Sequence, residues 1–222
     1  MIYLSWAVLY EGTTDAAYFD VLIPRVMQNL VETEGQRHSN IPAAPAVHLG
    51  SAGRAIDVVA KEACASQDAF HIVFIHADTG GRGLQAGIAN RSVAYCEAMH
   101  ACCDWPCRRC VVIAPRHETE AWVLADPAAV TGALGYSGRF QQIGLPSGAS
   151  EAERLPDPKA TLLDAVINVR GRRKQIYIEQ ILPSVAQRQS IDKLRRSRSF
   201  LDFENSLRTA LQDLGACARN LS

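Results

Sequence analysis

The sequence lacks any apolar run of the roughly 20 residues that a membrane span needs. It also lacks a basic segment before its apolar start and a small-residue cleavage site after it, so residues 2–10 predict a buried strand and not a signal peptide. Internal repeats and low-complexity segments are absent, and 48% hydrophobic with 21% charged residues excludes a fibrous or disordered chain. These absences predict a globular cytoplasmic protein with no membrane contact.

An excess of one charge is absent as well, since 23 Lys and Arg residues balance 23 Asp and Glu residues. The distribution is uneven: residues 1–150 hold 10 basic and 14 acidic side chains, and residues 151–222 hold 13 and 9. The chain is therefore not a uniformly basic nucleic-acid binder. An acidic site and a basic arm within one chain remain compatible with its composition.

Regularly paired cysteines are also missing. Seven are present, at positions 64, 96, 102, 103, 107, 110 and 217. An odd number without disulfide-like spacing predicts free thiols in a reducing compartment, where cysteine packs as a small hydrophobe. A structural Zn²⁺ at Cys103, Cys107 and Cys110, with Cys102 or His100 as fourth ligand, is the less favoured alternative because zinc ligands normally form two separated pairs.

Strand and helix patterns alternate over the first part of the chain. Apolar runs predict strands at residues 2–10, 46–49, 70–76 and 110–114, and helical spacing predicts helices from about residue 15 and at 56–64, 88–102 and 118–124. Pro24 either bends or divides the first helix. This alternation predicts an α/β fold with a mostly parallel sheet covered on both faces.

The pattern changes after about residue 135. Gly, Pro and Ser residues crowd positions 135–158, and helical spacing follows at 160–169, 175–186 and 199–214. In the last of these, Ser199 and Asp202 resemble a capping box. We therefore expect an α/β domain over residues 1–135 and a helical C-terminal extension over residues 136–222, packed on it.

Acidic residues follow three of the predicted strands. Glu11 follows the first, Asp78 follows the strand at 70–76, and Glu118 and Glu120 follow the strand at 110–114. Ligands of an open parallel sheet bind beyond the carboxyl ends of its strands, and carboxylate oxygens suit Mg²⁺. For each residue alone, the alternative is a carboxylate that caps the following helix.

These motifs together resemble a known family. The segment Glu11-Gly12-Thr13-Thr14-Asp15 is similar to the opening motif of TOPRIM domains, the Mg²⁺-binding fold of topoisomerases, primases and OLD-type (overcoming lysogenization defect) nucleases, and Asp78 stands where TOPRIM domains have their DxD motif. The segments HETEAW (117–122), LAD (124–126), PDPK (156–159) and LRRSRSF (194–200) extend the resemblance to a family of small TOPRIM-like bacterial proteins classed as a domain of unknown function. The resemblance implies a TOPRIM-like, Rossmann-like sheet.

The resemblance also implies hydrolysis of phosphodiester bonds in DNA or RNA, dependent on Mg²⁺ or Mn²⁺. The implied catalytic residues are Glu11, Asp78, Glu118, Glu120 and Lys159, and the implied metal ligands are Glu11, Asp15, Asp78, Glu120 and Asp126. Family members are often encoded beside an ATPase, which implies an AAA- or ABC-type ATPase partner in defence against phage or plasmids. One departure is Asp78-Thr79-Gly80, which lacks the second DxD carboxylate. The alternative function is therefore an inactive TOPRIM-like subunit that binds an ATPase or nucleic acid.

Basic residues are the expected nucleic-acid contacts, because Lys and Arg neutralise backbone phosphates. They are Arg82 in a Gly-rich loop, Arg172, Arg173 and Lys174 in one cluster, and Arg195 and Arg196 in another. A solvated helix face or a subunit contact, as in a homodimer, is the alternative. The Gly-rich loop lacks the Lys-Ser/Thr of a phosphate-binding P-loop, which argues against nucleoside triphosphate binding. A haloacid dehalogenase-type phosphatase ranks low, since it would have Asp where this chain has Glu11.

Overall fold

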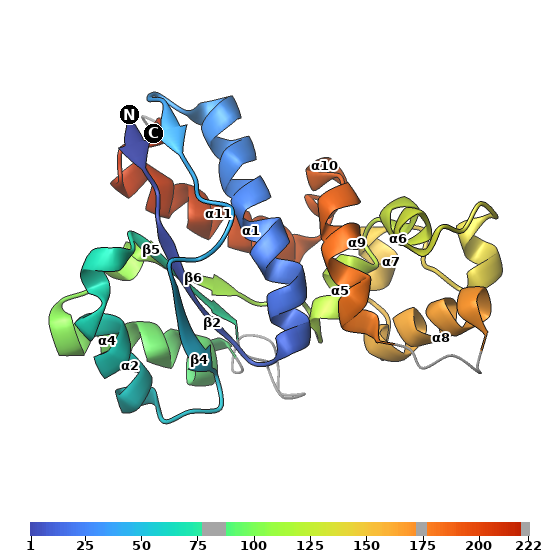
Figure 1. Ribbon diagram of the computed structural model, residues 1–222, viewed down its shortest axis with the longest axis horizontal. Coiled ribbons are helices and arrows are strands. Elements are labelled where there is room, and N and C mark those ends of the chain that lie inside the picture. Colours follow the sequence, from blue (N-terminus) through green and yellow to red (C-terminus); the bar gives the residue numbers. More distant parts are fainter. Residues whose placement is uncertain (77–87, 172–176, 219–222) are drawn as a thin grey trace. The chain divides into compact units, whose positions relative to one another are not determined.

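The chain forms two compact units. In the computed structural model, residues 1–76, 88–171 and 177–218 are described (Figure 1). Unit 1 comprises residues 1–12, 23–113 and 202–222, and unit 2 comprises residues 13–22 and 114–201. The predicted boundary at residue 135 thus lies inside unit 2, and the last part of the predicted extension groups with unit 1. No helix among the described residues combines the length and apolarity that a membrane crossing requires.

Unit 1 is built on a four-stranded, all-parallel sheet, as predicted. Its strands are β2 (Trp6–Tyr10), β4 (Val47–Ser51), β5 (Ile72–His76) and β6 (Cys110–Ile113), in the order β4-β2-β5-β6. A separate parallel pair joins β1 (Ile2–Tyr3) and β3 (Ser39–Asn40). The single strand predicted over residues 2–10 is therefore two strands, with Leu4 and Ser5 between them.

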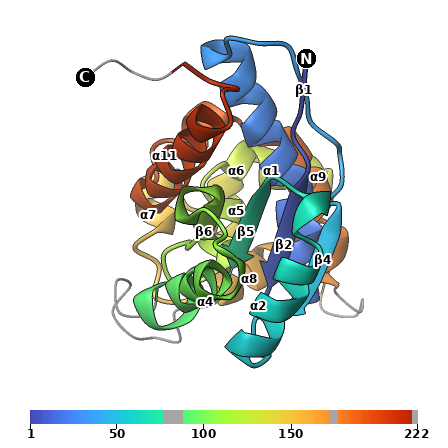
Figure 2. The same ribbon diagram turned by 90° about the vertical axis from the view of Figure 1, so that its left-hand side faces the viewer.

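The two central strands, β2 and β5, are buried at every position. This agrees with their continuous apolar sequences, which leave no face suited to water. Helices therefore flank the sheet on both sides (Figures 1 and 2). Among its described residues, the helices of unit 1 are α2 (Ile56–Ala65), α4 (Ala94–Cys103), residues 23–34 of α1 (Thr13–Glu34) and residues 202–213 of α11 (Arg198–Asp213).

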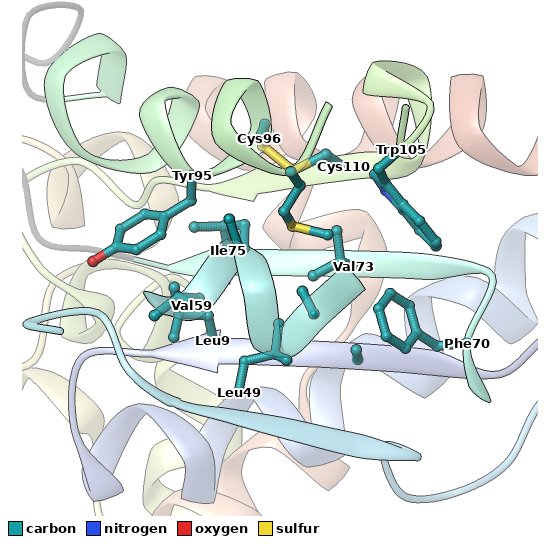
Figure 3. Packing of buried hydrophobic residues seen from close by; sticks show 14 of the residues in the cluster. Leu9, Leu49, Val59, Phe70, Val73, Ile75, Tyr95, Cys96, Trp105 and Cys110 are labelled. Atoms are coloured by element: carbon teal, nitrogen blue, oxygen red, sulfur yellow. A yellow bond between two sulfur atoms is a disulfide. The ribbon is translucent and has the colours of Figure 1, made fainter. Parts of the chain in front are cut away.

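Helices α2 and α4 cover one face of the sheet. Alternate residues of the central strands, including Leu9, Val73 and Ile75, pack there against Val59 of α2 and Met99 of α4. In Figure 3 the rings of Phe70 and Trp105 lie at one end of this cluster and Tyr95 lies at the other. The cluster holds α4 and the turn of π-helix before it, Ile88–Val93, next to the sheet.

The opposite face of the sheet carries the strand residues that alternate with those of the first face. Phe74 of β5 stacks edge-on against Trp6 of β2, with ring centroids 5.9 Å apart, and lies 6.3 Å from the ring of Phe203 in α11. Arg208 of α11 donates to both carboxylate oxygens of Glu34, at 3.0 and 2.8 Å, and so ties α11 to the end of α1. Residues 202–213 of α11 therefore pack on this face of the sheet through Phe203.

Helix α1 continues without a break through Pro24. Proline removes one backbone hydrogen bond and crowds the preceding turn, at a cost of about 3 kcal/mol in a helix interior. Leu22, Ile23, Val26 and Met27 around it are fully buried. Burial of each such side chain contributes about 1.5–3 kcal/mol, enough to keep the helix intact.

Unit 2 is helical in its C-terminal part, as predicted. Among its described residues, its helices are α5 (Thr119–Val123), α6 (Pro127–Leu134), α7 (Ala149–Ala152), α8 (Pro158–Arg170), α9 (Leu182–Arg188) and α10 (Ile191–Leu194), with residues 13–22 of α1 and 198–201 of α11. Short 3₁₀ turns occupy Phe140–Ile143 and Ile178–Gln180 in unit 2, and Gln67–Ala69 and Cys107–Arg109 in unit 1. Helices α6, α7 and α10 were not predicted from the sequence.

Trp122 is the centre of the core of unit 2. Its side chain is 0% exposed, and its ring meets Phe19 and Phe200 edge-on at 6.0 and 5.2 Å. Its indole N–H donates to Ser199 Oγ at 2.8 Å. The buried amide of Gln189 donates to the carbonyl of Trp122 at 2.7 Å and accepts from Tyr18 Oη at 2.6 Å. The tryptophan of the HETEAW motif is thus a packing residue.

Helix α11 begins one residue earlier than predicted. Ser197 caps it, because its Oγ accepts from the N–H of Phe200 at 3.1 Å. The predicted cap, Ser199, instead donates to Glu153 Oε1 at 2.7 Å. The prediction of a Ser199–Asp202 capping box is therefore wrong.

Four of the seven cysteines form disulfides, which corrects the prediction of free thiols. Cys64 of α2 is joined to Cys103 at the end of α4. Cys96 of α4 is joined to Cys110 of β6, and Figure 3 shows this second disulfide. Cys102 and Cys107 are exposed thiols and Cys217 is a buried one. Spacing alone did not reveal the pairs. Two helices bring together cysteines that are 39 residues apart, and a helix and a strand bring together cysteines that are 14 residues apart.

Alkylation of the unfolded protein tests these pairs. Without a reductant, three of the seven cysteines should take up iodoacetamide, and after reduction all seven should. Intact-mass spectrometry measures both numbers. Seven adducts before reduction, in protein purified without reductant, would contradict the disulfides. The double variant Cys96→Ser/Cys110→Ser should lower the free energy of unfolding by about 3 kcal/mol, the value for a loop of this size.

Candidate functional site

The carboxyl ends of β2 and β5 form the predicted ligand-binding edge in unit 1. After β2 the chain passes to β4 on one side, and β5 lies on the other side, so β2 and β5 flank the point where the strand order reverses. Glu11 follows the last residue of β2 directly. Asp78 is two residues beyond the end of β5 and lies outside the described residues, as does Arg82.

Glu11 is half-buried beside a cation. Its Oε1 lies 3.5 Å from a guanidinium nitrogen of Arg91, which belongs to the π-helical turn before α4. Tyr95, one turn further on, donates its hydroxyl to the carbonyls of Ala52 and Arg54 at 2.6 and 2.9 Å. Burial raises the pKa of Tyr95; the charge of Arg91 opposes this shift, and the charge of Glu11 acts in the same direction as burial.

A pocket of about 790 Å³ adjoins this edge. Arg91, Tyr95 and Arg54 line it, together with the start of α2. Arg54 is already paired, because its two terminal nitrogens donate to the two oxygens of Glu62 at 2.7 and 2.6 Å. The positive charge beside Glu11 therefore comes from Arg91.

A second candidate site lies within unit 2 and is called the carboxylate cluster here: Asp15, Glu118 and Glu120, with Thr119 and Lys159. Thr119 opens α5 and donates its buried hydroxyl to Asp15 Oδ1 at 2.6 Å, across 104 residues of sequence. Glu120, the next residue, is 5% exposed. The hydrogen bond therefore places Asp15 beside the 118–120 segment.

Glu120 carries the perturbed carboxyl group of the cluster. Burial raises its pKa above the ordinary glutamate value, and the charges of Glu118 and Asp15 raise it further. The charge of Lys159 and a hydrogen bond from its own backbone oppose this shift. Burial and like charges therefore favour the protonated form, which suits a group that donates a proton.

A strained turn places Glu118. His117 has a φ of 69°, and the N–H of Glu118 donates across it to the carbonyl of Arg116 at 3.0 Å. This is the γ-turn of positive φ, a rare conformation that costs about 1–3 kcal/mol at a residue other than glycine. The carboxylate of Glu118 does not cap α5, and its Oε2 is buried without a hydrogen-bond partner. A polar ligand or water at this oxygen would relieve that deficit.

Lys159 is exposed at the start of α8. Asp157 caps this helix by accepting from the N–H of Ala160 at 2.7 Å, and Pro158 is its first residue. The PDPK motif is therefore a helix start, in which proline suits the first turn. It leaves the ammonium of Lys159 near Glu120, whose pKa it lowers.

Asp126, a predicted metal ligand, is fully engaged by protein groups. It is 3% exposed and caps α6 by accepting from the N–H groups of Ala128 and Ala129 at 3.2 and 3.4 Å. It also accepts from the N–H of Ser190 at 3.1 Å and from Lys193 Nζ at 2.7 Å. These four donors occupy both carboxylate oxygens, so a structural role explains the burial of Asp126.

The donor chemistry of the predicted ligands suits Mg²⁺, because all are carboxylates. Within the described residues, however, no three His, Cys, Asp or Glu side chains converge as a metal-binding group. The zinc set is also disrupted, since Cys103 and Cys110 are each held in a disulfide. The described residues therefore hold no preformed metal cage, and we assign no reaction step to a metal.

The predicted basic contacts fall in different places. Arg172, Arg173 and Lys174 lie outside the described residues. Arg195 pairs with Asp192 at 2.8 Å. Arg196 is exposed and lines a pocket together with Arg154. Arg91, Arg154 and Thr119 were not predicted as site residues. Thr119 lies within the HETEAW motif, but its partner Asp15 and the partner of Arg91, Glu11, are remote in sequence.

Comparison of the chain with family models, with curated proteins and with solved structures finds no match.

The burial of Glu120 makes a prediction about pH and stability. A carboxyl whose pKa is higher in the folded state than in the unfolded state destabilises the fold above both values and not below them. Glu120→Gln should therefore be more stable than the wild-type protein near pH 8 and lose this advantage near pH 4, around the ordinary glutamate pKa. Urea unfolding at several pH values measures the difference. The exposed Glu179 provides the control Glu179→Gln, and a difference independent of pH would contradict the assignment.

The contacts of Asp126 make a second prediction. Asp126→Ala removes a helix cap and the partner of Lys193, and should lower the free energy of unfolding by about 2–4 kcal/mol. The matched change Asp157→Ala removes the cap of α8 and should cost about 1 kcal/mol. Urea unfolding is measured with and without Mg²⁺. If Mg²⁺ stabilised the wild-type protein and not Asp126→Ala, Asp126 would be a metal ligand after all.

Proposed function

We propose that this chain is a TOPRIM-type phosphodiesterase that hydrolyses DNA or RNA, as the effector partner of an ATPase in defence against phage or plasmids. The observation that carries the proposal is Glu120, a buried carboxyl of raised pKa beside two further carboxylates and a lysine. Such perturbed groups gather where proton transfer is needed. The ATPase partner and the defence role follow from the motif resemblance alone.

In this proposal the residues of the carboxylate cluster divide the work of hydrolysis. Glu118, through its unpartnered Oε2, takes a proton from the attacking water. The water oxygen bonds to phosphorus, the phosphorus–oxygen ester bond breaks, and Glu120 gives its proton to the departing oxygen. Lys159 contacts a phosphate oxygen and balances the charge that develops there.

Mg²⁺ or Mn²⁺ belongs to the proposal because carboxylate oxygens suit such ions, and within unit 2 Asp15 would hold one while Glu120 keeps its proton. When bound, such an ion would polarise a phosphoryl oxygen.

The alternative is a TOPRIM-like subunit that binds an ATPase or nucleic acid without cleaving it. One observation favours it: the described residues contain no converging group of three metal-binding side chains. The two functions differ in one assay, because a binding subunit retains nucleic acid without shortening it.

Cleavage of plasmid DNA and structured RNA tests the proposal. The wild-type protein should cleave with Mg²⁺ or Mn²⁺ and not with EDTA, and its rate should fall as pH rises through the pKa of Glu120. Glu120→Gln should lower the rate by about 10²–10⁴-fold, the usual contribution of a general acid. Lys159→Gln should lower it by about tenfold or more.

The exposed residue Glu179 supplies the control, and Glu179→Gln should cleave like the wild-type protein. Equal cleavage by all of these variants would indicate a contaminating nuclease and remove the proposal. Binding without cleavage, alone and with a purified AAA- or ABC-type ATPase, would favour the alternative.

A further inference from the structure

A polar pocket of about 540 Å³ lies within unit 2, apart from the carboxylate cluster in its lining residues. It is called the arginine pocket here and is lined by Ser147, Ser150, Glu151, Arg154 and Arg196, with Gly148 and Ala149. Two guanidinium groups and one carboxylate give it a net charge of about +1. Its volume lies within the range of about 300–1,000 Å³ that accommodates a group of small-molecule size.

The donors of this pocket have capacity to spare. Arg196 is exposed, and its side chain makes no hydrogen bond or ion pair with the described residues. Arg154 uses its Nε to donate to the carbonyl of Ser150 at 2.8 Å, which leaves both terminal nitrogens available. Guanidinium groups with open donors bind phosphate through paired hydrogen bonds.

The single carboxylate of the pocket is satisfied locally. Glu151 Oε2 accepts from the N–H and the hydroxyl of Ser147 at 2.7 and 2.6 Å. These hydrogen bonds lower the pKa of Glu151, with a smaller contribution from the charge of Arg154. Glu151 therefore orders the Ser147 turn, and the two arginines keep their donors for another anion.

A buried hydrogen-bond network holds the two arginines in place, although 41 residues separate them in sequence. Glu153, 8% exposed, accepts from the hydroxyls of Ser197 and Ser199 at 2.6 and 2.7 Å and from the N–H of Ser199 at 3.1 Å. Burial alone would raise the pKa of Glu153, but these hydrogen bonds outweigh it and lower the pKa. Glu153 immediately precedes Arg154 and Ser197 immediately follows Arg196, so one buried carboxylate fixes both backbones.

We propose that the arginine pocket binds one backbone phosphate of a polynucleotide, between the guanidinium groups of Arg154 and Arg196. The inference rests on the proposed function, which supplies a polymer of phosphodiesters as substrate. The hydrogen-bond network of Glu153 already orders both backbones, which lowers the conformational entropy that the two arginines would lose on binding. The pocket contributes affinity and orientation without reading sequence, as phosphate contacts do.

The salt dependence of binding tests this pocket directly. Fluorescence anisotropy measures the affinity for a labelled duplex DNA and an RNA duplex of the same sequence, in EDTA, over a range of salt concentrations. Arg154→Gln and Arg196→Gln should each reduce the slope of log affinity against log salt by about 1, the effect of one lost phosphate contact. The double variant should lose little more than either single variant, because both arginines hold the same phosphate.

Arg37 provides the matched control, because it is an exposed arginine of unit 1 and Arg37→Gln changes the net charge equally. It should leave the slope unchanged. Thermal unfolding should show that the variants remain folded. Slopes for Arg154→Gln and Arg196→Gln that equal that of the wild-type protein or of Arg37→Gln would overturn the proposal, as would a wild-type protein that binds neither duplex.

A second measurement separates a polymer from a free anion. Calorimetry with inorganic phosphate should show weak binding to the wild-type protein that the double variant loses. Binding of inorganic phosphate without any change of the duplex slope in the double variant would assign the pocket to a free anion and overturn the proposal. The binding measurements do not depend on cleavage, so the two proposals can fail separately. If the arginines bind the duplex and the cleavage assay shows no cleavage, the proposed function is contradicted and the assignment of the pocket stands.

Discussion

Burial of β2 and β5 on both faces is the constraint on which the rest of unit 1 depends. Strands with no polar face must be covered twice, which requires a helix after each strand and parallel connections between them. Parallel strands end at a common edge, so this covering also decides where the polar residues that follow them can lie. Glu11 and its partner Arg91 are at this edge because two apolar strands and the π-helical turn before α4 bring them there.

The packing of unit 2 depends more on buried polar groups than the packing of unit 1 does. Gln189, Asp126 and Glu153 are all buried, and each makes several hydrogen bonds between segments that are far apart in sequence. Together with the ring contacts of Trp122, they fix short helices that would not be stable alone. Against this background, the buried and unpartnered oxygen of Glu118 differs from the pattern, and it lies beside the strained turn at His117. Buried polar atoms without a hydrogen-bond partner and strained backbone turns concentrate at functional sites.

The sequence predicted the sheet of unit 1 well because its strands are apolar runs of the right length between turn residues. The strand at 70–76 and the helix at 56–64 agree with β5 and α2 to within two residues. It also placed Asp15, Glu118, Glu120 and Lys159 among the candidate site residues; in the structure Thr119 contacts Asp15, and the charges of the other three act on Glu120.

Features that depend on partners distant in sequence could not be predicted. The disulfides pair cysteines on different elements, and the burial of Glu120 depends on how unit 2 packs. Asp126 has the residue type of a metal ligand, and its four hydrogen-bond donors became visible with the fold. Pro24 suggested a break in α1, but the apolar residues around it keep the helix continuous.

The two disulfides have a consequence for the cooperativity of unit 1. One joins the end of α4 to α2, and the other joins its first turn to β6. A surface helix usually opens by fraying from its ends, independently of the sheet beneath it. With both of its ends cross-linked, α4 can separate only as far as α2 and β6 allow, so its backbone amides and those of the sheet belong to a single unit of hydrogen exchange.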